Sequence, residues 1–453
     1  MYLAYSLLLS LGLLVLIPHF LFQALAHGKY VEGLRQRFGL LPARTIARHP
    51  VIWLHCVSVG ETQAARPLVD QLKRQFPHHA LVVSTITRTG QKLARDVFAK
   101  QAEEVFYFPF DWRWTARRAL SAINPDAVLI METELWPNFL RECESREIPV
   151  ALVNGRISRQ SFRRYSAIKF FLERMLRSLT VAVMQSDVDA GRLRDLGMPV
   201  ERLHTAGNLK FDAKDISMPT EQTLEIRERF GLRDDVSLIL AASTHAPEEQ
   251  IILDSFKQLR GPARLMLAPR HPERFQEVAS LIRESGLSWA RRTDAPSAGD
   301  ADAAVILLDT IGELPSTYAL ATVVFVGGSI VDRGGHNVLE PAAAGVPVVT
   351  GAHTHNFHAI VDQLNKAEAL VQLPPVEGAR ASAEASAELA QALTSLLADA
   401  DRRAELATRA KQLIATNRGA AERTINLIAP LLSPPRQNSS NSNPLLTAKA
   451  QTS

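Results

Sequence analysis

From residue 50 onward the chain alternates short apolar runs, rich in β-branched and aromatic residues, with segments of helical periodicity. This alternation is typical of a parallel β-sheet, because parallel strands need long crossover connections that are usually helices. Each apolar run is therefore expected to be a buried strand. In the first half of the chain these runs are VIWLH, ALVVSTIT, VFYFPF, DAVLIME, PVALVNG and LTVAVMQS.

The pattern stops in a polar stretch near residues 210–222 and then restarts. The later runs are VSLILAAS, ARLMLAPRH, AAVILLDT, ATVVFVGGS and VPVVTG. A chain of 453 residues is also longer than a single core usually grows. We predict two Rossmann-like, doubly wound α/β domains, at residues 28–210 and 211–432. The Ser/Asn/Pro-rich end, residues 433–453, is predicted to be disordered.

The N-terminal stretch contains no Asp, Glu, Lys or Arg before Lys29. It is long enough for a membrane-spanning or deeply inserted helix, so we predict that residues 1–27 are a membrane anchor. The basic residues that follow place the rest of the chain on the cytoplasmic side of the membrane. A cleaved signal peptide is the alternative, and Pro18 leaves a shallower, monotopic insertion open.

The composition of the chain limits the kinds of partner that it is expected to bind. The chain has only two cysteines, Cys56 and Cys143, without metal-binding spacing, so neither a disulfide framework nor a zinc site is supported and a reducing cytoplasm fits. The net charge of +4 is mild, but arginines bunch in residues 154–179. This cluster favours an anionic partner, with an anionic lipid surface as one possibility and a solvated helix face as the alternative.

Ligands of open parallel sheets bind beyond the carboxyl ends of the strands, so the loops that leave the strands carry the candidate site. We expect the loops of the two domains to face each other across a cleft. In the first domain, CVSVGE places Glu61 at the start of a helix, and METELWPN places Glu132 and Glu134 at the end of a strand. The alternative for these acids is a favourable charge at a helix N-terminus.

The second domain contains the densest motif, GGSIVDRGGHNVLEP, at residues 327–341. Its glycines allow the backbone to approach a ligand, and free N–H groups at a helix start favour phosphate. Glu340 is a candidate to bind ribose hydroxyls, unless it only stabilises its own helix. The motif is neither GxGxxG nor a P-loop, which counts against a dinucleotide or P-loop protein.

Basic residues near the ends of two other segments are candidates to bind a phosphate. Arg270 and His271 follow a predicted strand, and the alternative for Arg270 is a surface ion pair with an acid such as Glu273. Lys210 stands close to the predicted linker, and its alternative is an ordinary solvated lysine.

Two patterns resemble metal sites, but we predict that both have structural roles instead. Asp187 and Asp189 form a DxD sequence, but they follow Ser186, and this order indicates helix capping. The histidines of HTHNFH lack a patterned acidic or cysteine partner and are predicted to lie in a polar loop. No metal site is predicted.

The motifs SVGE, METELWPN, NGRIS, GNLKFD, PRHPER, GGS and GGHNVLEP occur in this order behind the apolar N-terminus. Together they closely resemble the 3-deoxy-D-manno-octulosonic acid (Kdo) transferases of lipopolysaccharide biosynthesis, glycosyltransferase family 30. The resemblance covers residues 1–425 and implies a GT-B glycosyltransferase. Such an enzyme transfers Kdo from CMP-Kdo to the lipid A precursor, lipid IVA, at the cytoplasmic face of the inner membrane. It implies no cofactor and no nucleic-acid partner.

The resemblance also implies roles for residues at matching positions. Glu61 resembles the family's general base, and Glu132 and Lys210 resemble its transition-state stabilisers. The implied reaction inverts the sugar's configuration and needs no metal. The nucleotide contacts fall on Arg270, His271, Ile311, Gly312, Glu313, Asn337, Val338, Leu339 and Glu340.

Two other functions remain as alternatives. One is a GT-B transferase that uses a UDP-sugar on another lipid or glycan. The other is a membrane-attached nucleotide-binding protein without turnover, which would not need acids at the strand ends of the first domain.

For Glu61 itself, we predict that the helix dipole lowers its basicity and that desolvation by the acceptor restores it.

Overall fold

The computed structural model describes residues 2–27, 33–41, 49–212, 220–376 and 381–432, without the side chains of residues 16–27 and 381. The predicted tail at 433–453 lies outside these residues, as does most of the predicted linker. The chain divides into two compact units. Unit 1 contains residues 1–209 together with 420–453, and unit 2 contains residues 210–419.

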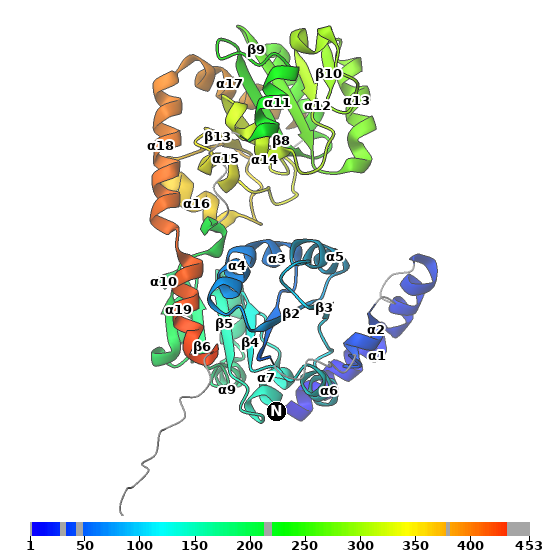
Figure 1. The fold of residues 1–453 in the computed structure, drawn as a ribbon, viewed down its shortest axis with the longest axis vertical. Coiled ribbons are helices and arrows are strands. Elements are labelled where there is room, and N and C mark those ends of the chain that lie inside the picture. Colours follow the sequence, from blue (N-terminus) through cyan, green and yellow to red (C-terminus); the bar gives the residue numbers. More distant parts are fainter. Residues whose placement is uncertain (1, 28–32, 42–48, 213–219, 377–380, 433–453) are drawn as a thin grey trace, which may run out of the picture. The chain divides into compact units, whose positions relative to one another are not determined.

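Unit 1 is built on a parallel sheet of seven strands in the order β3-β2-β1-β4-β5-β6-β7 (Figure 1). Its strands are buried almost throughout, as the continuous apolar runs predict for a sheet covered on both faces. The strands are β1 (Val51–His55), β2 (Ala80–Thr85), β3 (Glu104–Tyr107), β4 (Ala127–Met131), β5 (Val150–Gly155), β6 (Val181–Met184) and β7 (Leu203–Thr205).

Helices cover both faces of this sheet. One face packs against α6 (Arg113–Ile123), α7 (Pro137–Glu144), α9 (Lys169–Leu176) and α10 (Asp187–Asp195). The other face packs against α4 (Arg66–Gln75), α5 (Arg88–Val97) and α19 (Ala420–Leu432). Three short helices complete the unit: α2 (Leu34–Arg37), α3 (Val59–Ala64) and α8 (Arg159–Ser166).

Unit 2 repeats the plan with a parallel sheet in the order β10-β11-β9-β8-β12-β13-β14. Its longest strands are β8 and β9, which pair along most of their length. The strands are β8 (Ser237–Thr244), β9 (Ala263–Pro269), β10 (Trp289–Arg291), β11 (Val305–Leu307), β12 (Val323–Val326), β13 (Val348–Thr350) and β14 (Val371–Gln372).

Helices again cover both faces of the sheet in unit 2. One face packs against α11 (Glu221–Arg229), α15 (Leu339–Ala343), α16 (His358–Lys366) and α18 (Ala400–Asn417). The opposite face packs against α12 (Glu248–Gln258), α13 (Phe275–Glu284) and α17 (Ala381–Ala398). The short helix α14 (Leu314–Thr317) links β11 to β12. Two parallel-sheet α/β units are thus present, as the sequence predicted.

The last helix places the domain boundary differently from the prediction. The sequence assigned residues 211–432 to the second domain, but α19 belongs to unit 1. Its residues Ile425 and Ile428 are buried in the core that α4 and β1 share, and Arg423 donates a hydrogen bond to the carbonyl of Ala206 at 2.9 Å. The apolar periodicity of α19 marks a helix with one buried face but does not say which sheet that face covers.

Helix α1 (Tyr2–His27) belongs to unit 1, and two of its serine hydroxyls accept hydrogen bonds from the rest of that unit. Asn138 donates a hydrogen bond to Ser6 Oγ at 3.0 Å, and the indole of Trp112 donates one to Ser10 Oγ at 2.9 Å. Among the residues that the structure describes, no helix is both long and apolar enough to cross a membrane. The anchor predicted at residues 1–27 is therefore not confirmed.

Candidate active site

A reversal of strand order lies beside the first strand of each sheet, and the carboxyl ends at such a reversal are where α/β proteins bind ligands. In unit 1 the reversal lies between β1 and β4, and in unit 2 it lies between β8 and β12. Glu61 follows β1 and Glu132 follows β4, so the two predicted catalytic acids flank the reversal of unit 1.

Glu61 occupies the first turn of α3 and is only 6% exposed. The backbone N–H of Val57 donates a hydrogen bond to its carboxylate at 2.8 Å, and the hydroxyl of Ser58 donates another at 3.0 Å. Ser58 also caps the helix by accepting from the Glu61 N–H. Glu61 therefore has a structural role at the helix start, and the same contacts hold its carboxylate in one position.

The environment of Glu61 raises its pKa to about 8, through burial first and then through the negative charge of Glu132. The lowered basicity predicted from the helix dipole is therefore wrong. Burial and a neighbouring acid outweigh both the dipole and the hydrogen bonds to the ionised form. A carboxylate that ionises near pH 8 is a strong enough base to take a proton from a hydroxyl in a transition state.

Glu132 lies just past the end of β4 with a φ of 54°. A non-glycine residue in this left-handed region is strained, and such strain is common at functional sites. Its N–H continues the sheet by donating to the carbonyl of Val153 at 3.0 Å. The strand ends at Met131, so Glu132 and Glu134 follow it in a loop and do not share a strand face. Burial, followed by the charge of Glu132, raises the pKa of Glu134.

Lys210 lies in a short 3₁₀ helix, Leu209–Asp212, at the beginning of unit 2. Its ammonium group stands 4.8 Å from the ring centroid of Phe357, at the start of α16. An aromatic face at this distance attracts a cation and restricts its position.

The GGS motif at the end of β12 is organised by a buried acid from α12. The carboxylate of Glu248 accepts hydrogen bonds from the N–H groups of Gly328, Ser329 and Ile330 at 2.7, 2.9 and 2.9 Å. A fourth N–H, that of His245, donates at 3.0 Å. These three N–H groups are therefore committed to Glu248 and do not belong to the helix start that was predicted to favour phosphate.

Glu340 lies in the first turn of α15 and is oriented from two sides. The amide of Asn337 donates to one carboxylate oxygen at 3.0 Å, and the phenol of Tyr318 donates to the other at 3.3 Å. The side chains of Val338 and Leu339 are 1% and 3% exposed and belong to the core. Residues 337–340 were all predicted to contact the nucleotide. Because the side chains of Val338 and Leu339 are buried, these two residues could contact it only through their backbone groups.

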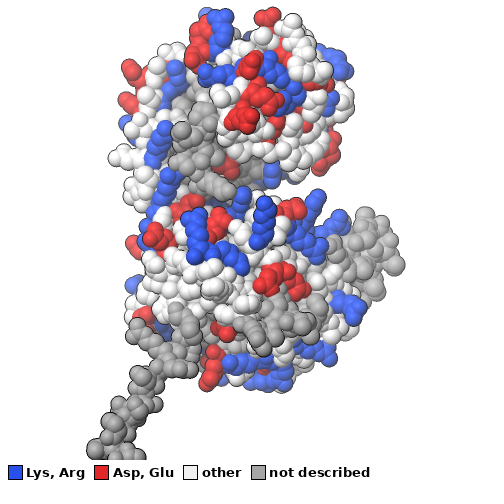
Figure 2. Space-filling view, viewed as in Figure 1, with Lys and Arg blue, Asp and Glu red and all other residues white. Residues whose placement is uncertain are grey.

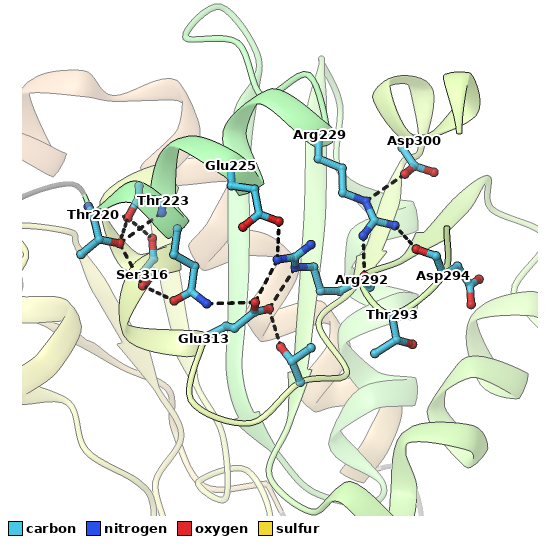
Figure 3. Close-up of polar contacts among 12 residues, drawn as sticks. Thr220, Thr223, Glu225, Arg229, Arg292, Thr293, Asp294, Asp300, Glu313 and Ser316 are labelled. Carbon is cyan, nitrogen blue, oxygen red and sulfur yellow. Dashed lines mark hydrogen bonds and ion pairs between the residues drawn. The ribbon is translucent and has the colours of Figure 1, made fainter. Parts of the chain in front are cut away.

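The segment Ile311–Glu313 follows β11 and forms a loop before α14. Ile311 is 80% exposed, and Gly312 has a φ of 93°, which favours glycine. The carboxylate of Glu313 is held by neighbouring side chains of its own unit (Figure 3). The three residues were predicted together as nucleotide contacts, but their side chains have different roles.

Arg270 and His271 follow the end of β9, as predicted, and both are exposed. The N–H of Arg270 extends the sheet by donating to the carbonyl of Thr244 at 3.0 Å. The carboxylate of Glu273, considered as an ion-pair partner for Arg270, lies instead 3.6 Å from Nδ1 of His271. The ring of His271 also packs edge-on against that of His245, with centroids 5.0 Å apart.

Two histidines that the sequence analysis missed meet at the strand reversal of unit 2. Nε2 of His245 lies 2.8 Å from Nε2 of His336, and the two rings are stacked. Burial and then the charge of Arg270 lower the pKa of His336 to about 3, while burial also lowers the pKa of His245. Both rings are therefore neutral at pH 7, and one donates to the other. The sequence did contain a signal that could have identified them, because His245 directly follows β8 and His336 lies inside the GGHN motif.

The described ranges contain no group of three or more His, Cys, Asp or Glu residues arranged to hold a metal ion. Asp189 instead belongs to a helix cap, because its N–H donates to Ser186 Oγ at 3.2 Å. The interpretation of the DxD sequence as capping is confirmed. The two cysteines are buried and free.

Comparison with known proteins connects this geometry to an activity. Residues 32–213 match the family described as 3-deoxy-D-manno-octulosonic-acid transferase (kdotransferase). The transferase of Haemophilus influenzae with this name is 33% identical over 407 residues, which cover 89% of this chain and 92% of the relative. The Bordetella pertussis transferase is 32% identical over 401 residues, covering 86% and 90%.

Among solved structures, Alr3699/HepE of Anabaena in complex with UDP is similar, with a TM-score of 0.55 and 13% identity. The match covers 84% of this chain and 99% of that protein, and it supports the two-unit α/β fold alone. The sequence relatives identify the chain as a glycosyltransferase. The chain belongs to the family of 3-deoxy-D-manno-octulosonic acid (Kdo) transferases.

Proposed function

We propose that this glycosyltransferase moves Kdo from CMP-Kdo to the lipid A precursor, lipid IVA, with inversion at the sugar and with Glu61 as the general base. The observation that carries the proposal is the state of Glu61 at the strand reversal of unit 1. It is buried, held by Val57 and Ser58, and has a pKa raised to about 8. No purely structural role in the helix cap requires a carboxylate of such basicity.

The proposed step balances in atoms and charge. The acceptor hydroxyl oxygen forms a bond to the ketosidic carbon of Kdo while its proton passes to the Glu61 carboxylate. The bond between that carbon and the phosphate oxygen of CMP breaks, and CMP leaves with the electron pair. Inversion requires the base to act on the face of the sugar opposite the leaving group. Glu132 and Lys210 are proposed to stabilise the charges that develop in this transition state.

Unit 2 is proposed to bind the donor nucleotide. Glu340, oriented by Asn337 and Tyr318, offers carboxylate oxygens to the two ribose hydroxyls. Arg270 and His271 are exposed just past the end of β9, where a cation suits the phosphate. The remaining contacts are assigned to Ile311, Gly312, Glu313 and residues 337–339. CMP-Kdo as donor is supported by membership of the family.

The reaction is proposed to need no metal and no cofactor. A departing monophosphate carries negative charge that another transferase would neutralise with a divalent cation. In this chain Lys210 and Arg270 supply positive charge for the same purpose. Transfer that continues in EDTA is the expected result.

The proposed site of action is the cytoplasmic face of the inner membrane. One edge of α1 contacts the rest of unit 1, while its opposite side exposes leucines. Figure 2 shows Lys and Arg side chains gathered along the edge of unit 1 near α6. Apolar and basic side chains on neighbouring helices suit an anionic lipid surface. The exposed apolar residues of α1 are Leu3, Leu7, Leu8, Leu11, Leu14 and Val15, at 59–74%.

The proposal is tested by incubating the full chain with tetra-acylated lipid A precursor and either CMP-Kdo or a set of UDP-sugars. Mass spectrometry of the lipid is expected to show added Kdo with CMP-Kdo alone. Transfer from a UDP-sugar would favour the alternative transferase. Nucleotide binding without any transfer would favour a non-catalytic protein.

A further inference from the structure

The carboxylate of Glu313 has no hydrogen-bonding capacity left for a ligand (Figure 3). One oxygen accepts from the Gln222 amide and from an Arg292 N–H, both at 2.9 Å. The other accepts from the Thr310 hydroxyl at 2.6 Å and from Nε of Arg292 at 3.0 Å. A carboxylate offers about four lone-pair sites, and all four are occupied here.

Gln222 joins helix α11 to this loop with both ends of its amide. Its nitrogen donates to Glu313, and its oxygen accepts from the hydroxyl of Ser316 at 2.8 Å. The hydroxyl of Thr220, the N-cap of α11, donates to the same Ser316 hydroxyl at 3.2 Å. The amide cannot flip without losing both bonds, so the loop and the start of α11 are locked together.

Arg292 supplies the charge that keeps Glu313 ionised. Its guanidinium binds both carboxylate oxygens, and both side chains of the pair are only 12% exposed. Burial by itself raises the pKa of Glu313, but the hydrogen bonds from Arg292 and Thr310 outweigh it and hold the pKa below its usual value. A second acid, Glu225, also pairs with Arg292 at 2.8 Å but is 59% exposed.

The loop that carries Ile311 and Gly312, which these contacts hold in place, exposes its backbone and one apolar side chain. Ile311 is 80% exposed directly before Gly312, whose φ of 93° turns the chain. An apolar side chain beside rigid N–H and C=O groups suits the face and the polar edge of a planar base. Cytosine and uracil differ at that edge, since cytosine offers an amino donor and a ring acceptor where uracil offers the reverse.

We propose that Gln222, Arg292 and Thr310 act through Glu313 as positioning residues, fixing the Ile311–Gly312 backbone so that it selects cytosine over uracil. The inference rests on the proposed CMP site but assigns base selection to backbone groups rather than to the Glu313 carboxylate. Fixed hydrogen-bonding groups reject a mismatched partner strongly, because a mismatch leaves buried polar groups unpaired. A loose loop adapts to either base.

The test compares CMP and UMP affinities by calorimetry in two Thr310 variants. Thr310→Val keeps the shape but removes the hydroxyl, whereas Thr310→Ser keeps the hydrogen bond to Glu313. Thr310→Val is expected to weaken CMP about 3- to 10-fold with a smaller effect on UMP, the size of one lost hydrogen bond. Thr310→Ser is expected to keep the wild-type preference. Gln222→Met tests the same network from α11 and is expected to behave like Thr310→Val.

Arg233→Ala is the control, because it removes an exposed ion pair with Asp235 outside the network. Thermal melting verifies that each variant is folded. An unchanged CMP-to-UMP ratio in both Thr310→Val and Gln222→Met overturns the inference. A wild-type chain that does not bind CMP overturns the proposed function instead, so the two failures are distinguished.

Discussion

Glu248 and Gly328 are joined by a hydrogen bond of 2.7 Å from the glycine N–H to the buried carboxylate. Glu248 begins α12 after β8, while Gly328 follows β12, so the bond crosses the strand reversal of unit 2. Two further N–H groups of the same loop share the carboxylate. The loop that carries the GGS motif therefore has a fixed shape before any donor is bound.

Glu248→Gln is expected to lower the stability of the chain. The amide keeps the volume but replaces one acceptor oxygen with an NH₂ group that faces N–H donors, at a position with 0% exposure. A loss of about 2–4 kcal/mol in the free energy of unfolding is expected. Urea denaturation measures it, with the exposed Glu228→Gln as control. Equal midpoints for the two variants would contradict this account of the loop.

The pH dependence of transfer follows from the raised pKa of Glu61. A general base acts in its ionised form, so kcat/KM is expected to rise with pH and to level off above about pH 8. The charge of Glu132 contributes to that raised pKa. In Glu132→Gln the rising limb of the residual activity is therefore expected at lower pH. A limb that stays in place would show that another group controls the profile.

Tyr318→Phe probes how Glu340 is positioned. The substitution removes the 3.3 Å hydrogen bond and leaves the buried ring in place. CMP affinity is expected to fall about 2- to 5-fold, and further in Glu340→Ala, which removes the ribose acceptor itself. Calorimetry with CMP measures both. Unchanged affinity in Glu340→Ala would remove Glu340 from the nucleotide site.

Membrane binding is expected to depend on the leucines of α1. Introducing charge with Leu7→Glu and Leu11→Glu together should weaken binding to vesicles containing anionic lipid about 10-fold or more, since each leucine loses apolar burial. Vesicle co-sedimentation measures it. Leu224→Glu changes a similarly exposed leucine, at 60%, on α11 in unit 2 and serves as the control. Equal binding by all three proteins would exclude α1 as the lipid contact.

The sequence predicted the central strands well and missed the short outer ones. Long apolar runs such as those of β1, β4 and β8 are buried on both faces, so composition alone marks them. Strands β7, β10 and β14 are two or three residues long and lie next to or at the sheet edges. Their residues mix polar with apolar types and are only partly buried, so they form no apolar run that distinguishes them from loops.

The places of Glu61, Glu132 and Arg270 just beyond strand ends, and of Glu340 in the first turn of a helix, were predictable, while their roles in a site stay predictions. What each side chain binds was not. Two of the three partners of Glu313 come from α11 and from the loop after β10, and no local pattern links positions 222, 292 and 313. The direction of the Glu61 pKa was also missed, because it depends on burial and on Glu132, both produced by tertiary packing.

The most direct test of the account is the rate of Kdo transfer by Glu61→Gln, with CMP binding measured on the same preparation and the chemical step rate-limiting. Glutamine keeps the shape of the side chain and can still accept a hydrogen bond, but it cannot take the acceptor's proton. We predict unchanged CMP affinity and a rate about 10²- to 10⁴-fold below wild type. Near-normal transfer would contradict the account, leaving Glu61 as a helix-capping carboxylate and Glu132 as the next candidate for the base.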